Sequence, residues 1–284
     1  MGCLQQLLLL FFFILTFIEV IMARVIVVTS GKGGVGKTTC TASIGAMLGY
    51  RGKRVLLIDA DIGLNNLDVL VGIDDKVVYD MADVISGRCR VKQALVSSPD
   101  IPNMYVLPSQ NAYNSDGISM KDFRTLISKL SDGFDFIFID CPAGIDKGFH
   151  RAVAPSSEAL IIATPNVSSL RDADKVISIL HNYKLSAINL IVNRMRGDMV
   201  LNGEMMSVME ISKILNVSPI GVIPDDDKIH IFTELGKIGK AECLAMRSFE
   251  CVADNFITGR RRLYDPTAQY RGMVGKLKLM LKRA

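Results

Sequence analysis

A glycine-rich loop near the start of the chain has the residues needed to bind a nucleoside triphosphate. Residues 31–38 read GKGGVGKT and match the phosphate-loop pattern G-x-x-x-x-G-K-[ST]. Glycines let the backbone N–H groups turn toward a phosphate without a Cβ clash, and a helix N-terminus after the loop adds its positive dipole end. We expect Lys37 to neutralise the β- and γ-phosphates and the Thr38 hydroxyl to bind Mg²⁺. The predicted phosphate-binding residues are Gly31, Lys32, Gly33, Gly34, Val35, Gly36, Lys37, Thr38 and Thr39.

Aspartates follow two apolar segments that are predicted to be strands. Asp59 and Asp61 come after Val55–Ile58, and Asp140 comes after Phe136–Ile139. Ligands of an open α/β sheet bind at the carboxyl ends of its strands, so we expect these carboxylates to lie beside the phosphate loop. Asp140, supported by Asp59, would then hold Mg²⁺ directly or through water, and Asp61 would orient or activate the attacking water. Each aspartate could instead cap the helix that follows its strand.

The predicted reaction is therefore Mg²⁺-dependent transfer of a phosphoryl group from a nucleoside triphosphate to water. Positioning and charge neutralisation would drive it, without a covalent nucleophile. The sequence shows no recognisable Ser-His-Asp or Cys-His set, and His150, His181 and His230 are far apart along the chain. The six cysteines are scattered without a C-x-x-C pair, which favours a reducing compartment over a disulfide framework.

The elements that must position this chemistry alternate along the chain. Short apolar runs of the kind that form strands buried on both faces alternate with segments of helical period. The predicted strands are Val25–Thr29, Val55–Ile58, Tyr105–Leu107, Phe136–Ile139, Leu160–Ala163, Asn189–Val192 and Ile220–Ile223. We expect a doubly wound, mostly parallel α/β sheet with helices on both faces, formed as one P-loop ATPase domain by residues 22–259.

Besides the helix after the phosphate loop, three further helices can be located between these strands. Ser119 with Asp122 predicts a helix start before an apolar stripe, and Ser169 with Asp172 predicts a second helix start. A third helix is expected to carry the apolar residues Met205, Met206, Met209 and Ile214, and such stripes are more often core than cofactor sites.

Both ends of the chain differ from this domain. Residues 7–18 are nearly all Leu, Phe and Ile, but as a helix they span only ~18 Å, short of a ~30 Å hydrocarbon core. Residues 1–21 could be an anchor, a weak signal or an upstream extension. We favour the extension, with Met22 as the natural start, because the phosphate-binding strand begins directly after it.

The last 25 residues form a basic tail. Residues 260–284 contain eight Lys or Arg residues and one Asp, so this segment carries +7 and the rest of the chain −3. A basic amphipathic helix that binds an anionic membrane surface fits this pattern, although a helix docked on the domain is the alternative. The predicted membrane-facing residues are Met273, Lys276, Leu277, Met280 and Leu281.

The phosphate loop also resembles one particular family. Residues 32–39 look like the deviant Walker A loop of the MinD, ParA and nitrogenase-reductase family, in which the first lysine reaches the partner's nucleotide across a dimer interface. The resemblance implies this role for Lys32, and a homodimer that encloses two ATP molecules. Residues 22–31, 61–68, 78–80, 140–145, 167–174 and 221–225 resemble MinD proteins more specifically, and residues 141–146 and 205–208 resemble plastid and cyanobacterial members.

The resemblance to MinD proteins implies a role in placing the septum through a division inhibitor or another regulator of the FtsZ ring. It implies that Asn193 and Pro224 contact adenine, and that Arg171, Asp172 and Asp174 bind a MinE-like activator. It also implies a C-terminal helix that binds membrane. The expected location is the plastid stroma, peripheral on the inner envelope membrane, or alternatively the cytoplasmic face of a cyanobacterial inner membrane.

Other classes of P-loop protein make different predictions. A ParA-type DNA-segregation ATPase would need a basic body, whereas the net −3 outside the tail argues against nucleic acid as a partner. An iron–sulfur electron donor would need a recognisable pair of cysteines in each subunit. A small-molecule kinase would need an acceptor site, and none is recognisable in the sequence.

Overall fold

The computed structural model describes residues 22–62, 66–109, 118–240, 242–271 and 275, and is built on one eight-stranded sheet. The strand order is β3-β4-β2-β5-β1-β6-β7-β8, and every neighbouring pair is parallel except β3 and β4. The strands are β1 Arg24–Thr29, β2 Val55–Asp59, β3 Val96–Ser97, β4 Met104–Leu107, β5 Phe136–Asp140, β6 Glu158–Ala163, β7 Ala187–Met195 and β8 Pro219–Pro224.

The predicted fold class and all seven predicted strands are confirmed. Among the strands that the structure describes, only β3 was missed, because two residues are too few to show a period.

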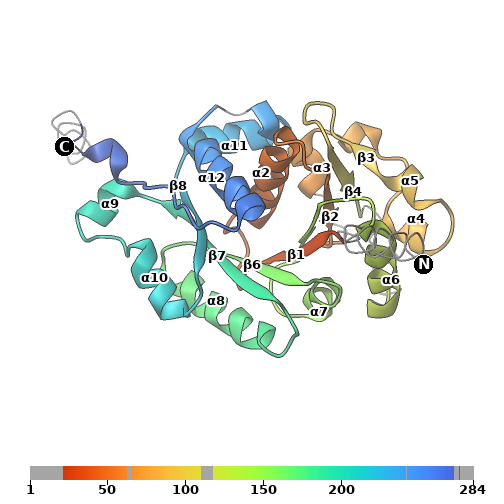
Figure 1. The fold of residues 1–284 in the computed structure, drawn as a ribbon, viewed down its shortest axis with the longest axis horizontal. Helices are drawn as coiled ribbons and strands as arrows, with labels where there is room; N and C mark the ends of the chain where they lie inside the picture. Colours follow the sequence, from red (N-terminus) through yellow and green to blue (C-terminus); the bar gives the residue numbers. More distant parts are fainter. Residues whose placement is uncertain (1–21, 63–65, 110–117, 241, 272–274, 276–284) are drawn as a thin grey trace, which may run out of the picture.

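Helices cover both faces of the sheet (Figure 1). One face carries α2 Lys37–Tyr50, α3 Asn66–Val71, α11 Asp227–Glu234 and α12 Leu244–Thr258. The other carries α4 Met81–Ile85, α6 Met120–Ser131, α7 Lys147–Val153, α8 Val167–Leu180 and α10 Val208–Leu215. The short helices are α5 Val91–Ala94 and α9 Gly197–Leu201, with 3-10 turns at Asp74–Lys76, Ile238–Lys240 and Ala268–Tyr270.

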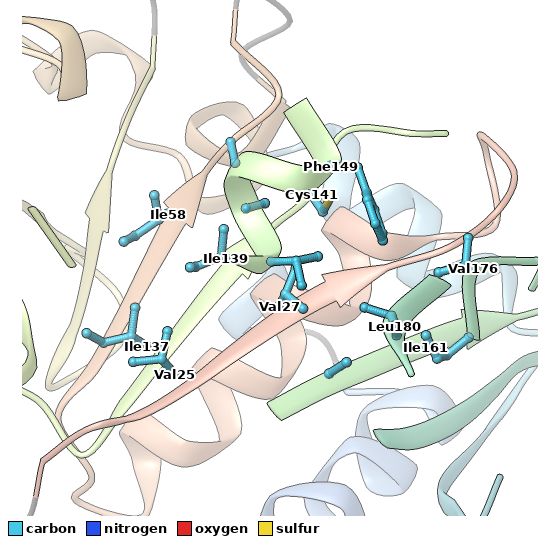
Figure 2. Packing of buried hydrophobic residues seen from close by; sticks show 14 of the residues in the cluster. Val25, Val27, Ile58, Ile137, Ile139, Cys141, Phe149, Ile161, Val176 and Leu180 are labelled. Carbon is cyan, nitrogen blue, oxygen red and sulfur yellow. The ribbon is translucent and has the colours of Figure 1, made fainter. Parts of the chain in front are cut away.

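Side chains of the central strand β1 point alternately to the two faces of the sheet and so contribute to both layers of the core. Val25 and Val27 pack with α7 and α8 on one face, whereas Ile26 and Val28 pack with α2 and α12 on the other. Figure 2 shows the first of these layers, where the labelled side chains from β1, β2, β5 and β6 meet Phe149 of α7 and two residues of α8. Burial on both faces explains why these strands read as continuous apolar runs.

The three helix predictions have different outcomes. Helix α6 begins after Ser119, whose hydroxyl accepts a hydrogen bond from the Asp122 N–H at 3.1 Å, as predicted. The predicted start at Ser169 was wrong, because Asn166 caps α8 and accepts from the Ser169 N–H at 2.9 Å.

The third helix also differs from its prediction. Met205 and Met206 precede α10, which begins at Val208. Met209 and Ile214 are 64% and 57% exposed, so their stripe faces solvent, and Ile211 and Leu215 on α10 are the buried side chains.

After α12 the chain runs back along the sheet; residues 260–271 are called the C-terminal strap. Arg261 at its start donates to Asn189 Oδ1 of β7 at 3.0 Å. The buried side chain of Asn255 donates to Ile220 O of β8 and to Arg262 O of the strap, and accepts from the Arg262 N–H. The strap ends beside α9, at the upper left of Figure 1.

The domain boundary expected at residues 259 and 260 stays a prediction. Residues 1–21 and the membrane-facing residues predicted in the tail lie outside the described residues. Among the helices that the structure describes, none combines the length and apolar composition needed to cross a bilayer.

Candidate functional site

The phosphate loop joins β1 to α2 and presents a helix N-terminus that lacks a side-chain cap. Gly36 at the N-cap has φ 95° and Gly34 has φ 75°, a left-handed conformation that favours glycine. No side chain caps the first turn of α2, so its backbone N–H groups are left for another acceptor. Ser30 Oγ donates to Lys32 O at 2.7 Å and fixes the turn. This geometry fits a bound phosphate.

Two predicted aspartates lie side by side at the carboxyl edge of the sheet. Asp59 ends β2 and Asp140 ends β5, and the two residues are register partners in the β2–β5 pair. Both are buried, with 3% exposure each. Burial, reinforced by repulsion from Asp140, raises the pKa of Asp59 to about 7. Burial also raises the pKa of Asp140 to about 6, although a hydrogen bond from the Thr38 hydroxyl and the charge of Lys37 oppose that rise.

This pair of carboxylates fits Mg²⁺. Carboxylate and hydroxyl oxygens are ligands that Mg²⁺ prefers, and a divalent cation would relieve the repulsion between Asp59 and Asp140. Within the described residues no three His, Cys, Asp or Glu side chains converge into a metal site of their own. In a P-loop site Mg²⁺ is held by a hydroxyl, one or two carboxylates and phosphate oxygens, and Thr38, Asp59 and Asp140 are residues of this kind.

Asp61 lies beyond β2 on the same edge. Its backbone N–H donates to Asp59 Oδ1 at 2.9 Å, which holds the turn after the strand. Burial raises the pKa of the Asp61 carboxyl, and the nearby Lys37 ammonium opposes the rise. The structure therefore brings Lys37, Thr38, Asp59, Asp61 and Asp140 together, as the sequence predicted.

Lys32 is placed differently from Lys37. Its Nζ donates to Ser168 Oγ at 2.8 Å, on the first turn of α8, and its side chain is exposed. The backbone of the loop also packs on this helix, since a Cβ on Gly31 would lie 2.1 Å from the Asp172 carbonyl oxygen. Lys32 is thus held by a helix of its own chain, whereas Lys37 is the lysine whose charge acts on Asp61 and Asp140.

The expected adenine contacts lie at the other side of the loop. Asn193 Nδ2 donates to Val35 O at 2.8 Å, and a Cβ on Gly36 would lie 2.5 Å from the same nitrogen. Asn193 and Pro224, at the ends of β7 and β8, line a cavity that Gly36 and Thr39 also line. Asn193 and Pro224 are therefore neighbours of the phosphate loop, as expected of residues that hold a base.

The three residues expected to bind an activator are on α8. Arg171 and Asp174 are exposed, and Asp172 is half-buried and pairs with Lys175 at 3.2 Å. Two large apolar side chains near the same edge are also exposed, Ile145 after β5 at 45% and Val167 at the start of α8 at 59%. The rim of the phosphate loop is thus an exposed surface of mixed apolar and charged character.

Two residues at this site were not predicted from the sequence. Ser168 binds Lys32 across 136 residues of chain, and no local pattern shows such a contact. Arg194 follows Asn193 at a bulge in the β7–β8 register, has φ 58°, and lines a cavity of about 320 Å³ beside the loop together with Lys32 and Asn166. Its position directly after a strand on the ligand-binding edge is the signal that could have identified it.

Comparisons with known proteins agree with this geometry. Residues 23–192 match the model of a family described as an AAA domain. The chain is 50% identical over 216 residues to a septum site-determining protein MinD of Synechocystis sp., covering 76% of this chain and 81% of that protein. It is 40% identical over 260 residues to a putative septum site-determining protein MinD of Chlorella vulgaris, covering 90% and 92%.

Solved structures of MinD proteins also match this chain. A MinC:MinD cell division protein complex of Aquifex aeolicus has a chain that matches with a TM-score of 0.79 at 41% identity, covering 85% of this chain and 99% of that one. A septum site-determining protein MinD of Pyrococcus horikoshii, complexed with Mg-ADP, matches with a TM-score of 0.75 at 30% identity, covering 84% and 97%.

Proposed function

Because the chain belongs to the MinD family of septum site-determining ATPases, we propose that two copies of it join face to face across their phosphate loops when ATP is bound. The chain hydrolyses ATP with Mg²⁺ and acts in placing the division site. The main support for the dimer is the position of Lys32. Its side chain is exposed and hydrogen-bonded to α8, whereas the charge of Lys37 acts on Asp61 of the acidic cluster. A lysine on the rim can reach a nucleotide in a facing copy.

The residues of the cluster have separate roles in this proposal. Lys37 binds the β- and γ-phosphates, and Thr38, Asp140 and Asp59 hold Mg²⁺, which neutralises charge on the phosphates when bound. Asp61 is on the same edge and orients the attacking water. Lys32 of the partner copy adds a cation as charge develops in the transition state.

At the base end, Asn193 and Pro224 contact adenine. Their support is the cavity that they share with Gly36 and Thr39, together with the hydrogen bond that ties Asn193 to the loop at Val35. Gly31, Gly33 and Gly34 supply backbone N–H groups to the phosphates.

Helix α8 is the proposed site of a MinE-like activator. Arg171, Asp172 and Asp174 are on the helix that also holds Lys32 and packs on Gly31. An activator bound there acts on the phosphate loop directly, because the loop and the helix are in contact. A division inhibitor of the MinC type, or another regulator of the FtsZ ring, is the proposed second partner, since the Aquifex structure is a MinC:MinD complex.

The basic tail is proposed to bind anionic lipid. One short amphipathic helix binds weakly, whereas two tails on one dimer gain effective concentration, so membrane binding reports the nucleotide state. The chain is of the plastid and cyanobacterial type. We propose the plastid stroma, with the protein peripheral on the inner envelope membrane.

Co-sedimentation with anionic liposomes tests this proposal. Wild-type chain should bind with ATP and release with ADP or without nucleotide, and Lys37→Ala should not respond to ATP. Lys76→Ala, which removes an exposed lysine of the 3-10 turn Asp74–Lys76, is the matched control and should behave as wild type. Equal binding in all three nucleotide states would contradict the proposal. Binding to DNA instead of liposomes would favour a ParA-type role.

A further inference from the structure

A third cavity, of about 900 Å³, opens beside the proposed base site, between the ends of β7 and β8 and the C-terminal strap. It is called the acidic pocket. Pro224, Asp225 and Asp226 line both this pocket and the cavity at the base end, so the two share a wall. None of the catalytic roles proposed above uses the rest of the acidic pocket.

The pocket combines apolar surface with an excess of negative charge. Met195 and Met246 line it and are buried, and Leu244 lines it and is half-buried. Acidic side chains outnumber basic ones by six to three: Asp198, Asp225, Asp226, Asp227, Glu242 and Glu250 against Arg196, Lys228 and Arg247. An apolar lining with acidic residues around it is complementary to a basic amphipathic helix.

The C-terminal strap ends at the wall of the acidic pocket. Gln269 and Tyr270 form part of the pocket wall, and Tyr270 is only 7% exposed. Gly197 is in tight contact with the strap, since a Cβ there would lie 2.0 Å from the Pro266 carbonyl oxygen. Gly275 lies against the backbone of Tyr270, because its own Cβ would be 2.3 Å from the Tyr270 carbonyl carbon. Gly275 therefore lies directly beside the end of the strap.

The residues that follow have the matching chemistry. Residues 276–284 contain four basic side chains, no acidic ones, and four Leu or Met residues. As a helix these nine residues would span ~14 Å. They follow closely after the pocket wall, because residues 269 and 270 line the pocket and Gly275 lies against the backbone of Tyr270.

We propose that the acidic pocket binds residues 276–284 of the same chain when no ATP is bound, and so withholds their apolar face from lipid. The inference rests on the proposed membrane role of the tail. ATP would weaken this docking through the shared wall at Pro224–Asp226, and the tail would become available when the dimer forms. The membrane response would then depend on release of the tail as well as on pairing of two tails.

Cross-linking of the full chain tests the docking without any membrane. Cys243 lines the pocket and is half-buried, so a thiol-to-amine cross-linker can report which lysines approach it. Without nucleotide we expect cross-links from Cys243 to Lys276, Lys278 or Lys282, lost in Cys243→Ser and retained in Cys251→Ser. A saturating non-hydrolysable ATP analogue should reduce their yield about fivefold or more, at the lower end of typical coupling between two sites.

Two outcomes of this experiment would overturn the docking. One is a yield from Cys243 to the tail lysines no higher than to exposed lysines elsewhere, such as Lys76. The other is cross-links that form only between isotope-labelled and unlabelled copies, which would place the tail on another chain. Neither outcome depends on whether ATP drives membrane binding, so failure here is distinct from failure of the proposed function.

Charge reversal gives the second measurement. Glu242→Lys with Glu250→Lys changes two exposed acids of the pocket, and should raise liposome binding without ATP about fivefold or more. Asp74→Lys with Asp75→Lys makes the same change in charge on the 3-10 turn after α3 and is the matched control. An equal rise in both variants would mean only a general charge effect and would overturn the docking.

Discussion

The two ends of the ligand-binding edge of the sheet are built in different ways. At β1, β2 and β5, the phosphate end has short local motifs that place Lys37, Asp59 and Asp140 against one another. At β7 and β8, the far end is closed by residues that come from much later in the chain, through contacts such as Gly197 against Pro266. The first end holds the residues of the proposed chemistry, and the second lies between the proposed base site and the strap.

The difference predicts that hydrolysis and the proposed membrane coupling can be changed separately. A variant at the phosphate end should alter hydrolysis and leave the strap in place. A variant at the strap should alter stability and tail release while the phosphate loop stays intact. Substitutions at the two ends of the edge test whether these properties are separable.

The largest effect is expected for Lys32→Ala. Loss of the cation supplied to the partner's nucleotide should lower steady-state hydrolysis by roughly 100-fold or more, since cations supplied in trans contribute ~10³–10⁵ in related transfers. The affinity of the monomer for ATP should change much less, because the Lys32 side chain is exposed and bound to Ser168 of α8 in its own chain. Hydrolysis assays and equilibrium nucleotide binding measure the two quantities.

The unfolding free energy of Lys32→Ala should stay close to that of wild type, because Lys32 is exposed. Lys76→Ala again serves as the matched control and should hydrolyse ATP at the wild-type rate. Hydrolysis by Lys32→Ala at a rate near wild type would remove the reason for placing this lysine in the partner's site.

Gly197→Ala should have the next largest effect, at the other end. A Cβ at this position would lie 2.0 Å from Pro266 O, so the strap must move, at a cost of about 1–3 kcal/mol of unfolding free energy. Urea unfolding measures the loss. The hydrolysis rate should stay within about twofold of wild type, because the phosphate end is unchanged.

Gly133→Ala is the control for this substitution. Its nearest neighbour would be Leu130 O at 3.4 Å and its φ is outside the left-handed region, so we expect a change within ~0.5 kcal/mol. Equal losses for the two variants would mean that the strap is not packed on Gly197.

Much of the phosphate end could be read from the sequence, because its determinants are local. A loop of eight residues and two aspartate clusters after apolar strands are sufficient to predict Lys37, Thr38, Asp59, Asp61 and Asp140 at one edge. Strands that are buried on both faces were also predictable, because they appear in the sequence as continuous apolar runs.

The far end could not be read in the same way. Asn255 binds β8 and the strap through hydrogen bonds that no sequence period shows, and the Lys32–Ser168 contact spans 136 residues. The start of α8 was misplaced for a local reason, since Asn166 and Ser169 are both good caps and the structure uses Asn166. The exposed stripe of Met209 and Ile214 on α10 shows that helical period alone does not say which face is buried.

Ser168→Ala should have the smallest effect and should refine the role of α8. The change removes one exposed hydrogen bond that holds Lys32 in its own chain, which is worth about 0.5–1.5 kcal/mol. The affinity of the ATP-dependent dimer should therefore rise roughly twofold to tenfold, as measured by sedimentation equilibrium. In a Lys32→Ala background the same change should have no effect, and a weaker dimer in the single variant would contradict the prediction.

The molar mass of the wild-type chain in solution tests the central claim most directly. Analytical ultracentrifugation with Mg²⁺ and a saturating non-hydrolysable ATP analogue should show a species of twice the monomer mass, and the monomer alone with ADP. A chain that stays monomeric with the analogue would contradict the claim that two phosphate loops meet when ATP is bound.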